Sequence, residues 1–272
     1  MSDKFKAELV YLAPVLVSLA IGTLCGFMIM TSTMEIYRVT PFEEGVGSLG
    51  NGLYFVVLAG VGAVILYLLL IRKNHKLINL ITSFALTMAV FMLSMVYLFA
   101  IFSRFDIPYA EELILTASLL ITAIAYFAIF RIHSKLSTLV VLFFGGALGT
   151  FLGVSIPTLS AVLILGFLAV YDVFAVYRGP VGKIARVGLD QLRGLSVSFK
   201  DIQMGLGDLT FYAMLSGHML LYFGFVSCLA SIAGILIGCA LSLKMLEKKG
   251  MFPGLPFPIL FGLAAGFVAS LL

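Results

Sequence analysis

The stretch GFLAVYDVFAVY, residues 166–177, holds one acid, Asp172, inside an otherwise apolar run. A second apolar run, GLGDLTFYAML at residues 205–215, holds Asp208 in the same way. Ionisable side chains are costly at membrane depth, and those found there usually face the interior of a helix bundle and carry function. The two runs therefore predict a helical membrane protein in which Asp172 and Asp208 form one site.

The composition of the whole chain agrees with a membrane protein. Hydrophobic residues make up 62% of the 272 residues and charged residues only 11%, whereas soluble domains carry about 25% charged residues. The net charge of +4 is small, and the chain has no large basic cluster. A polytopic protein in contact with the lipid bilayer is therefore expected, and a nucleic-acid partner is not.

Apolar runs long enough to cross a bilayer recur along the chain. A span needs about 20 mostly apolar residues, and this rule predicts an all-α fold with nine transmembrane helices. The predicted spans are 10–31, 49–71, 77–102, 110–131, 136–154, 156–178, 205–226, 228–246 and 253–272. They divide one membrane domain, 1–272, into six helices in 1–178, a loop at 179–204 and three helices in 205–272.

The basic residues predict the orientation. Of the 17 Lys and Arg residues, all but Arg38 and Arg104 fall on the N-terminal side of the predicted membrane. Cytoplasmic loops carry an excess of Lys and Arg, so the N-terminus is expected in the cytoplasm and the C-terminus outside. Asp172 and Asp208 then lie near the cytoplasmic ends of two antiparallel helices, at similar depth.

A third unusual stretch, MFPGLPFP at residues 251–258, opens the last predicted span. Its three prolines deny helical hydrogen bonds, and they bias Leu255 and Phe257 toward extended backbone. Irregular backbone at membrane depth is tolerated only inside protein or beside water. The charge pattern places this stretch at the same end as the two acids.

Two close carboxyl groups in a low dielectric favour sharing one proton. The ionised group can then activate water, and the protonated group can bind a carbonyl oxygen, which is the logic of aspartic proteases and needs no cofactor. Gly205 and Gly207 could let another backbone approach Asp208, or they could simply be packing glycines. Tyr171 could bond near the site or belong to the aromatic belt at the interface.

Together the three stretches resemble the presenilin and signal-peptide-peptidase family of GxGD intramembrane aspartyl proteases. The similarity lies in YD in one span, GLGD in the next and PGLP before the last, with Gly254 where the family's PAL motif has alanine. It implies catalytic roles for Asp172 and Asp208 in hydrolysis of transmembrane-helix substrates by activated water. The residues that would support the site or bind substrate are Tyr171, Gly205, Leu206, Gly207, Pro253, Gly254, Leu255 and Pro256. The resemblance and the compact size suggest an archaeal homologue in the cell membrane, acting as a single chain without accessory subunits.

The polar loop before Asp208 contains a short strand pattern. Leu195, Val197 and Phe199 alternate with two serines, which is typical of a strand. We expect this segment, with the edge at 253–256, to pair with an unwound substrate as an added strand; a flexible linker is the alternative. Asp190 and Asp201 in the same loop are expected to be solvated.

The histidines and cysteines do not indicate a second reactive site. The chain has no HExxH motif, so a zinc protease site is not expected, and His218 is interpreted as a hydrogen-bonding group between helices. Cys25, Cys228 and Cys239 lie in apolar runs without CxxC spacing, as packing residues do.

Two other functions remain open. The acids could relay protons in a transporter or channel, or they could only join helices in a noncatalytic scaffold. The absence of an evident inverted repeat argues against a transporter. The oligomeric state is not indicated by the sequence.

Overall fold

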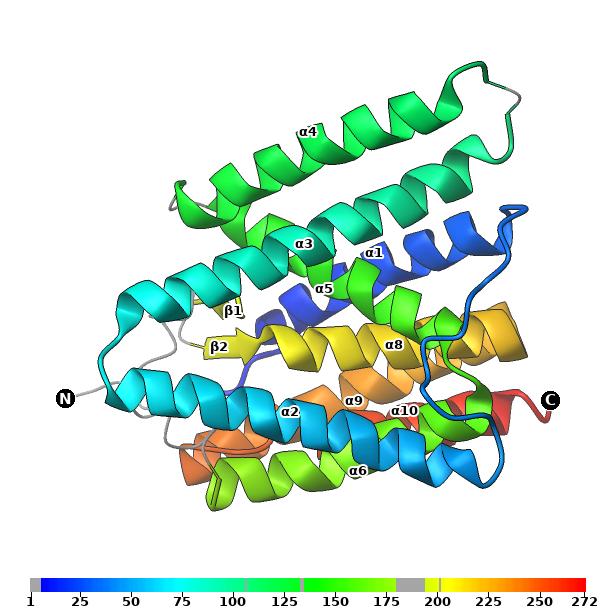
Figure 1. Ribbon diagram of the computed structural model, residues 1–272. Helices are drawn as coiled ribbons and strands as arrows, with labels where there is room; N and C mark the ends of the chain where they lie inside the picture. The colour runs from blue at the N-terminus through cyan, green and yellow to red at the C-terminus, as the bar shows by residue number, and fades with distance from the viewer. Residues whose placement is uncertain (1–5, 106, 133–134, 180–193, 201) are drawn as a thin grey trace.

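The structure is a computed structural model that describes residues 6–105, 107–132, 135–179, 194–200 and 202–272. In these residues the chain forms a bundle of long helices with one small hairpin at one end (Figure 1). The elements are η1 Leu9–Leu12, α1 Ala13–Met30, α2 Gly47–Ile71, α3 His75–Phe102, α4 Ala110–Phe130, α5 Lys135–Ser155, α6 Thr158–Tyr177, β1 Ser196–Phe199, β2 Ile202–Gly205, α8 Leu206–Phe223, α9 Phe225–Lys249 and α10 Pro256–Ala269.

Each predicted span corresponds to one of the α-helices of the described residues. Seven helices are long and apolar enough to cross a membrane, and α8 and α10 are not among them. The 14 residues of α10 reach about 21 Å at 1.5 Å per residue, less than the roughly 30 Å hydrocarbon core. The polytopic helical class is therefore confirmed, with seven helices that meet the criterion for a span.

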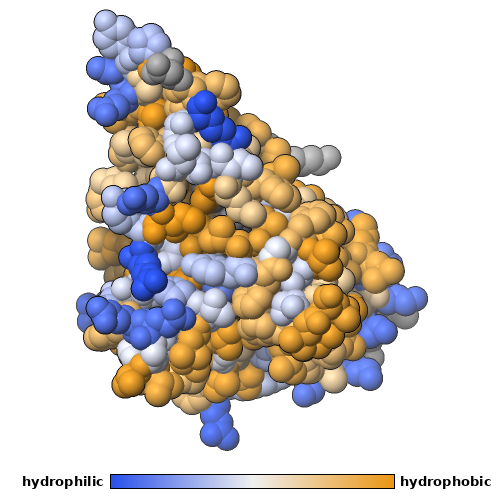
Figure 2. All heavy atoms as spheres, turned by 90° about the vertical axis from the view of Figure 1, so that its right-hand side faces the viewer, coloured by the Kyte–Doolittle hydropathy of each residue, from blue (hydrophilic) through white to orange (hydrophobic). Residues whose placement is uncertain are grey.

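The surface of the bundle suits a lipid environment. Figure 2 looks along the helices onto the end that holds the C-terminus, where hydrophilic groups lie among hydrophobic ones, so the lipid-facing surface is judged from the sides of the helices. On α2 only 6% of the most apolar window is buried, and its exposed side chains include Val57, Leu58, Val61 and Ile65. In water such a surface would be unfavourable, so these helices are expected to face lipid.

Helix α8 lies at the centre of the bundle and packs against α1, α5, α6, α9 and α10. Glycines let its neighbours come close. A Cβ on Gly149 of α5 would overlap the carbonyl oxygen of Thr210, and one on Gly153 would overlap that of Met214. The same holds between α9 and α10, where Gly234 lies against Phe261. Asp208 is thus carried by the most enclosed helix.

One boundary between helices lies where the sequence predicts it, and another is displaced. The tight connection at residues 155–157 lies where it was predicted, between α5 and α6. The break between α8 and α9 is at Gly224, which has φ of +89°, and Ser227 is buried inside α9. A positive φ favours glycine, so the boundary predicted near Ser227 was wrong by about one turn.

The loop before α8 ends in a hairpin. The predicted strand is confirmed as β1, and it pairs antiparallel with β2, which the sequence pattern did not predict. Val197 pairs with Met204, and both Val197 and Ile202 are buried. The N–H of Leu206 donates to the carbonyl of Leu195 at 2.8 Å, which joins the hairpin to the start of α8. Asp190 and Asp201 lie outside the described residues.

The proline-rich stretch is less irregular than predicted. Helix α10 begins at Pro256, and Leu255 before it has helical dihedral angles, φ −75° and ψ −39°. The extended geometry expected for Leu255 and Phe257 was therefore wrong. The first-turn N–H groups of a helix have no intrahelical acceptor, so prolines there break no bond. Residues 251–255 remain outside any helix.

Candidate active site

The two acids are carried by neighbouring helices. Asp172 lies five residues before the end of α6, and Asp208 is the third residue of α8. The two helices pack against each other, and Asp172 is the electrostatic neighbour of Asp208. Both side chains are partly exposed.

The short segment before α10 touches both acids. The N–H of Leu255 donates a hydrogen bond of 3.0 Å to Oδ2 of Asp172, and the N–H of Gly254 also donates to this carboxyl group. A Cβ added to Gly254 would lie 2.7 Å from Oδ2 of Asp208 and 2.9 Å from its Cγ. Two consecutive backbone residues therefore connect Asp172 on one side with Asp208 on the other.

Tyr212 fixes this segment from α8, and the sequence interpretation missed it. Its hydroxyl donates to the carbonyl of Gly254 at 2.8 Å, and it is also hydrogen-bonded with Cys239 of α9. Tyr212 follows Asp208 by four residues, and residues four apart share one face of a helix. That spacing is the signal that could have found it.

The two glycines of GLGD have room beside them in the structure. A Cβ on Gly205 would lie 3.7 Å from Oδ2 of Asp208, and one on Gly207 would lie 3.9 Å from the ring of Phe211. Both are ordinary contact distances. Gly205 ends β2, and Leu206 begins α8 with a buried side chain. Within the described residues, the backbone that approaches Asp208 closely is at Gly254, and an approach of substrate backbone at Gly205 and Gly207 stays a prediction.

The remaining residues of the predicted site lie around this centre. The Tyr171 ring faces α2, where a Cβ on Gly60 would lie 3.7 Å from its hydroxyl, so it lines the α2–α6 contact. Pro253 is buried, and Pro256 is the first residue of α10. Both set the path of the Gly254–Leu255 segment.

A small cavity lies beside Asp208. Its volume is about 110 Å³, and a site for one water needs roughly 10–15 Å³ measured in this way, so several waters fit. Polar groups from β2, α8 and α9 line part of it. The lining residues are Val15, Ile202, Gln203, Met204, Asp208, Tyr212, Cys239, Ser242, Leu243, Leu246, Phe252 and Gly254. Water can therefore reach one of the two carboxyl groups.

The other reactive side chains have structural surroundings. His218 contacts the carbonyl of Gly153 at 2.8 Å through Nδ1 and the hydroxyl of Thr158 at 3.2 Å through Nε2. This confirms its predicted role of joining helices, here α8 to α5 and α6. The cysteines Cys25, Cys228 and Cys239 are buried. Within the described residues, no three His, Cys, Asp or Glu side chains converge as a metal site would require.

Solved structures share this fold. One described as a presenilin family intramembrane aspartate protease, in a C222 crystal, aligns with a TM-score of 0.66 and 18% identity over 96% of this chain and 98% of that one. Another with the same description, in a P2 crystal, gives 0.67 and 19% over 98% and 99%. No family model and no curated protein sequence matches the chain. The likeness over nearly the full length establishes a presenilin-like fold.

Proposed function

We propose that this chain is an intramembrane aspartyl protease that hydrolyses peptide bonds in transmembrane segments, with Asp172 and Asp208 as its catalytic residues. One observation carries the proposal. Gly254 lies between the two acids: its N–H and that of Leu255 donate to Asp172 of α6, and its Cα side lies against the carboxyl group of Asp208 of α8. The sequence motifs and the fold of the two presenilin-family structures support the same reaction.

The reaction needs a base, an acid and water. Two carboxyl groups held together favour a state with one shared proton, and the cavity beside Asp208 has room for water. The ionised carboxylate takes a proton from water, and the water oxygen attacks the substrate carbonyl carbon. The protonated carboxyl group donates to the carbonyl oxygen. Collapse of the tetrahedral intermediate breaks the C–N bond, and the leaving nitrogen takes up a proton.

Nine spans with a cytoplasmic N-terminus are part of the proposal. The 15-to-2 division of Lys and Arg supports this orientation. Helices α8 and α10 are shorter or less apolar than the others, but α8 is enclosed by neighbouring helices and needs little lipid-facing surface. The cell membrane of an archaeon is the proposed location, and the single chain of 1–272 is proposed to act without accessory subunits.

The hairpin gives the substrate a place to pair. Gln203 and Met204 of β2 line the cavity that also contains Asp208, whereas β1 packs toward α5. An unwound segment added along β2 would therefore pass nearer to Asp208 than one added along β1. This refines the strand expected at 195–199: β1 supports the hairpin, and β2 is the proposed docking strand.

A peptide mimic with a hydroxyl group in place of the scissile carbonyl tests the proposal. It resembles the tetrahedral intermediate, and such analogues bind roughly 10²–10⁸-fold more tightly than substrates. We expect it to block cleavage of a reporter transmembrane peptide in liposomes at a concentration where the matching methylene compound does not. Proton flux that depends on Asp172 and Asp208, with no cleavage, would favour a transporter and contradict the proposal.

A further inference from the structure

A large apolar cavity lies among α1, α3, α4 and α5, none of which carries either of the two acids. Its volume is about 450 Å³, within the roughly 300–1,000 Å³ typical of small-molecule sites. Its lining is Ile21, Leu24, Cys25, Met28, Val90, Leu93, Ser94, Tyr97, Leu98, Ile101, Ile121, Ile124, Ala125, Val140, Phe143, Phe144 and Ala147. Nearly every group that faces the cavity is hydrocarbon.

Of the three polar side chains in the lining, Tyr97 and Cys25 already have partners, which leaves the hydroxyl of Ser94. The hydroxyl of Tyr97 donates to the carbonyl of Ala147 at 2.7 Å, and the Cys25 thiol is hydrogen-bonded with Tyr97. A polar ligand would lose its hydrogen bonds to water on entry and would gain none with the Tyr97 hydroxyl or the Cys25 thiol. The lining therefore suits a hydrocarbon chain, which loses no hydrogen bond on entry.

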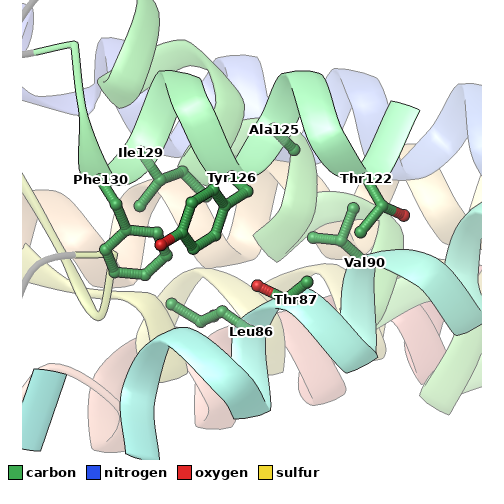
Figure 3. Close-up of a pocket in the computed structure, with 8 residues that line it drawn as sticks. All are labelled: Leu86, Thr87, Val90, Thr122, Ala125, Tyr126, Ile129 and Phe130. Atoms are coloured by element: carbon green, nitrogen blue, oxygen red, sulfur yellow. The ribbon is translucent and has the colours of Figure 1, made fainter. Parts of the chain in front are cut away.

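The cavity exists because α4 stands away from the rest of the bundle. Figure 1 shows the α3–α4 pair leaning out, with α4 as the outermost helix. Figure 3 shows the adjoining cleft between α3 and α4, where Val90 and Ala125 point toward each other. These two residues line both the cleft and the cavity, and small side chains such as Ala125 keep the space open.

One end of the cavity carries a positive charge. Met28 and Ile101 belong to the lining, and Arg104 follows Ile101 by three residues. Arg104 is exposed and donates through Nη2 to the carbonyl of Met28 at 2.7 Å. A guanidinium has five N–H groups, and within the described residues this carbonyl is its one hydrogen-bond acceptor. The remaining N–H groups can hold an anion such as a phosphate.

We propose that this cavity is a binding site for a membrane phospholipid, with one hydrocarbon chain among α1, α3, α4 and α5 and its phosphate at Arg104. The membrane supplies the occupant, since lipid surrounds helices of this kind. A basic group beside an apolar space between helices matches the shape of a phospholipid, with an anionic head and a long tail. The site is independent of the proposed protease chemistry.

Native mass spectrometry of the full chain purified in detergent, with added phosphatidylglycerol or phosphatidylcholine, tests the site. We expect one retained lipid per chain, with phosphatidylglycerol favoured at least about fivefold, or about 1 kcal/mol at RT near 0.59 kcal/mol, the size of one juxtamembrane charge. Arg104→Gln should remove this preference. Arg38→Gln, which changes the other basic residue predicted on that side, should keep it. Equal preferences in the wild type and both variants would overturn the phosphate assignment.

A matched pair of substitutions on α4 tests the hydrocarbon chain. Ala125→Phe fills the cavity, whereas Ala123→Phe makes the same change at an exposed position two residues away. Lipid retention should fall at least about tenfold in the first variant and stay unchanged in the second. Equal retention would overturn the proposal. A lipid-free dimer broken by Ala125→Phe would also overturn it, because a second copy would then occupy the cavity.

Photolabelling of the unmodified chain covers the case in which Ala125→Phe fails to fold. A phosphatidylglycerol with a diazirine on one acyl chain is incorporated, irradiated and mapped by peptide mass spectrometry. Labels should concentrate on buried lining residues such as Val90, Tyr97 and Phe144 rather than on the exposed face of α2. Equal labelling of the α2 residues Val57 and Val61, which are 61% and 52% exposed, would show ordinary bulk lipid and overturn the proposal.

Discussion

The backbone N–H of Leu255 donates a hydrogen bond of 3.0 Å to the carboxyl group of Asp172, 83 residues earlier in the chain. This bond joins the segment before α10 to α6. The next residue back, Gly254, rests against Asp208 of α8. Backbone atoms of Gly254 and Leu255 therefore hold the two proposed catalytic acids, and each contact can be tested by its own substitution.

Leu255→Pro should disable the enzyme through this one bond. The φ of Leu255, −75°, already suits proline, so the main loss is the donor to Asp172. A hydrogen bond to a charged group contributes about 1.5–3 kcal/mol, so reporter cleavage should fall at least about tenfold. Leu255→Ala keeps the N–H and is the control. Equal rates in the two variants would show that the bond is not needed.

Enlarging Gly254 should disturb Asp208 directly. A Cβ there would lie 2.7 Å from the carboxyl oxygen, so Gly254→Val should displace the carboxyl group and lower cleavage at least about 100-fold, the scale of removing one group that stabilises a transition state. Gly254→Ala should cost less, because one methyl group asks for a smaller shift. Gly205→Ala is the control, since its Cβ would meet Asp208 at an ordinary 3.7 Å. A larger loss at Gly205 than at Gly254 contradicts this geometry.

Photocrosslinking tests which strand of the hairpin meets the substrate. Gln203 on β2 and Ser198 on β1 are paired in register, and both are exposed. A benzophenone amino acid at position 203 should crosslink a transmembrane peptide several-fold more than the same group at 198. Mass spectrometry of the adducts should map to substrate residues near the cleaved bond. A stronger crosslink from position 198 would assign docking to β1.

The sequence predicts the chemistry-bearing residues better than the backbone that holds them. Asp172 and Asp208 are identifiable because an acid is costly in an apolar run, and the break at residues 155–157 is identifiable from Pro157. Strand β2 is only four residues long and ends in Gly205, so its pattern is too short to stand out, and only its partner β1 was predicted.

One error and one omission come from reading local preferences without tertiary contacts. Proline disfavours helical dihedral angles in the residue before it, yet Leu255 adopts them as the N-cap of α10, with its N–H bonded to Asp172. Tyr212 was missed because its partner, the carbonyl of Gly254, is 42 residues away.

The central claim is that Asp172 and Asp208 work as one catalytic pair. The most direct measurement is mass spectrometry of the products from a helix-destabilised transmembrane peptide in liposomes, with wild type, Asp172→Asn and Asp208→Asn compared at equal amounts of folded protein. We expect the wild type to cleave within the span, toward the end where the acids lie, and each variant to lose essentially all product. Full cleavage by either variant would contradict the claim.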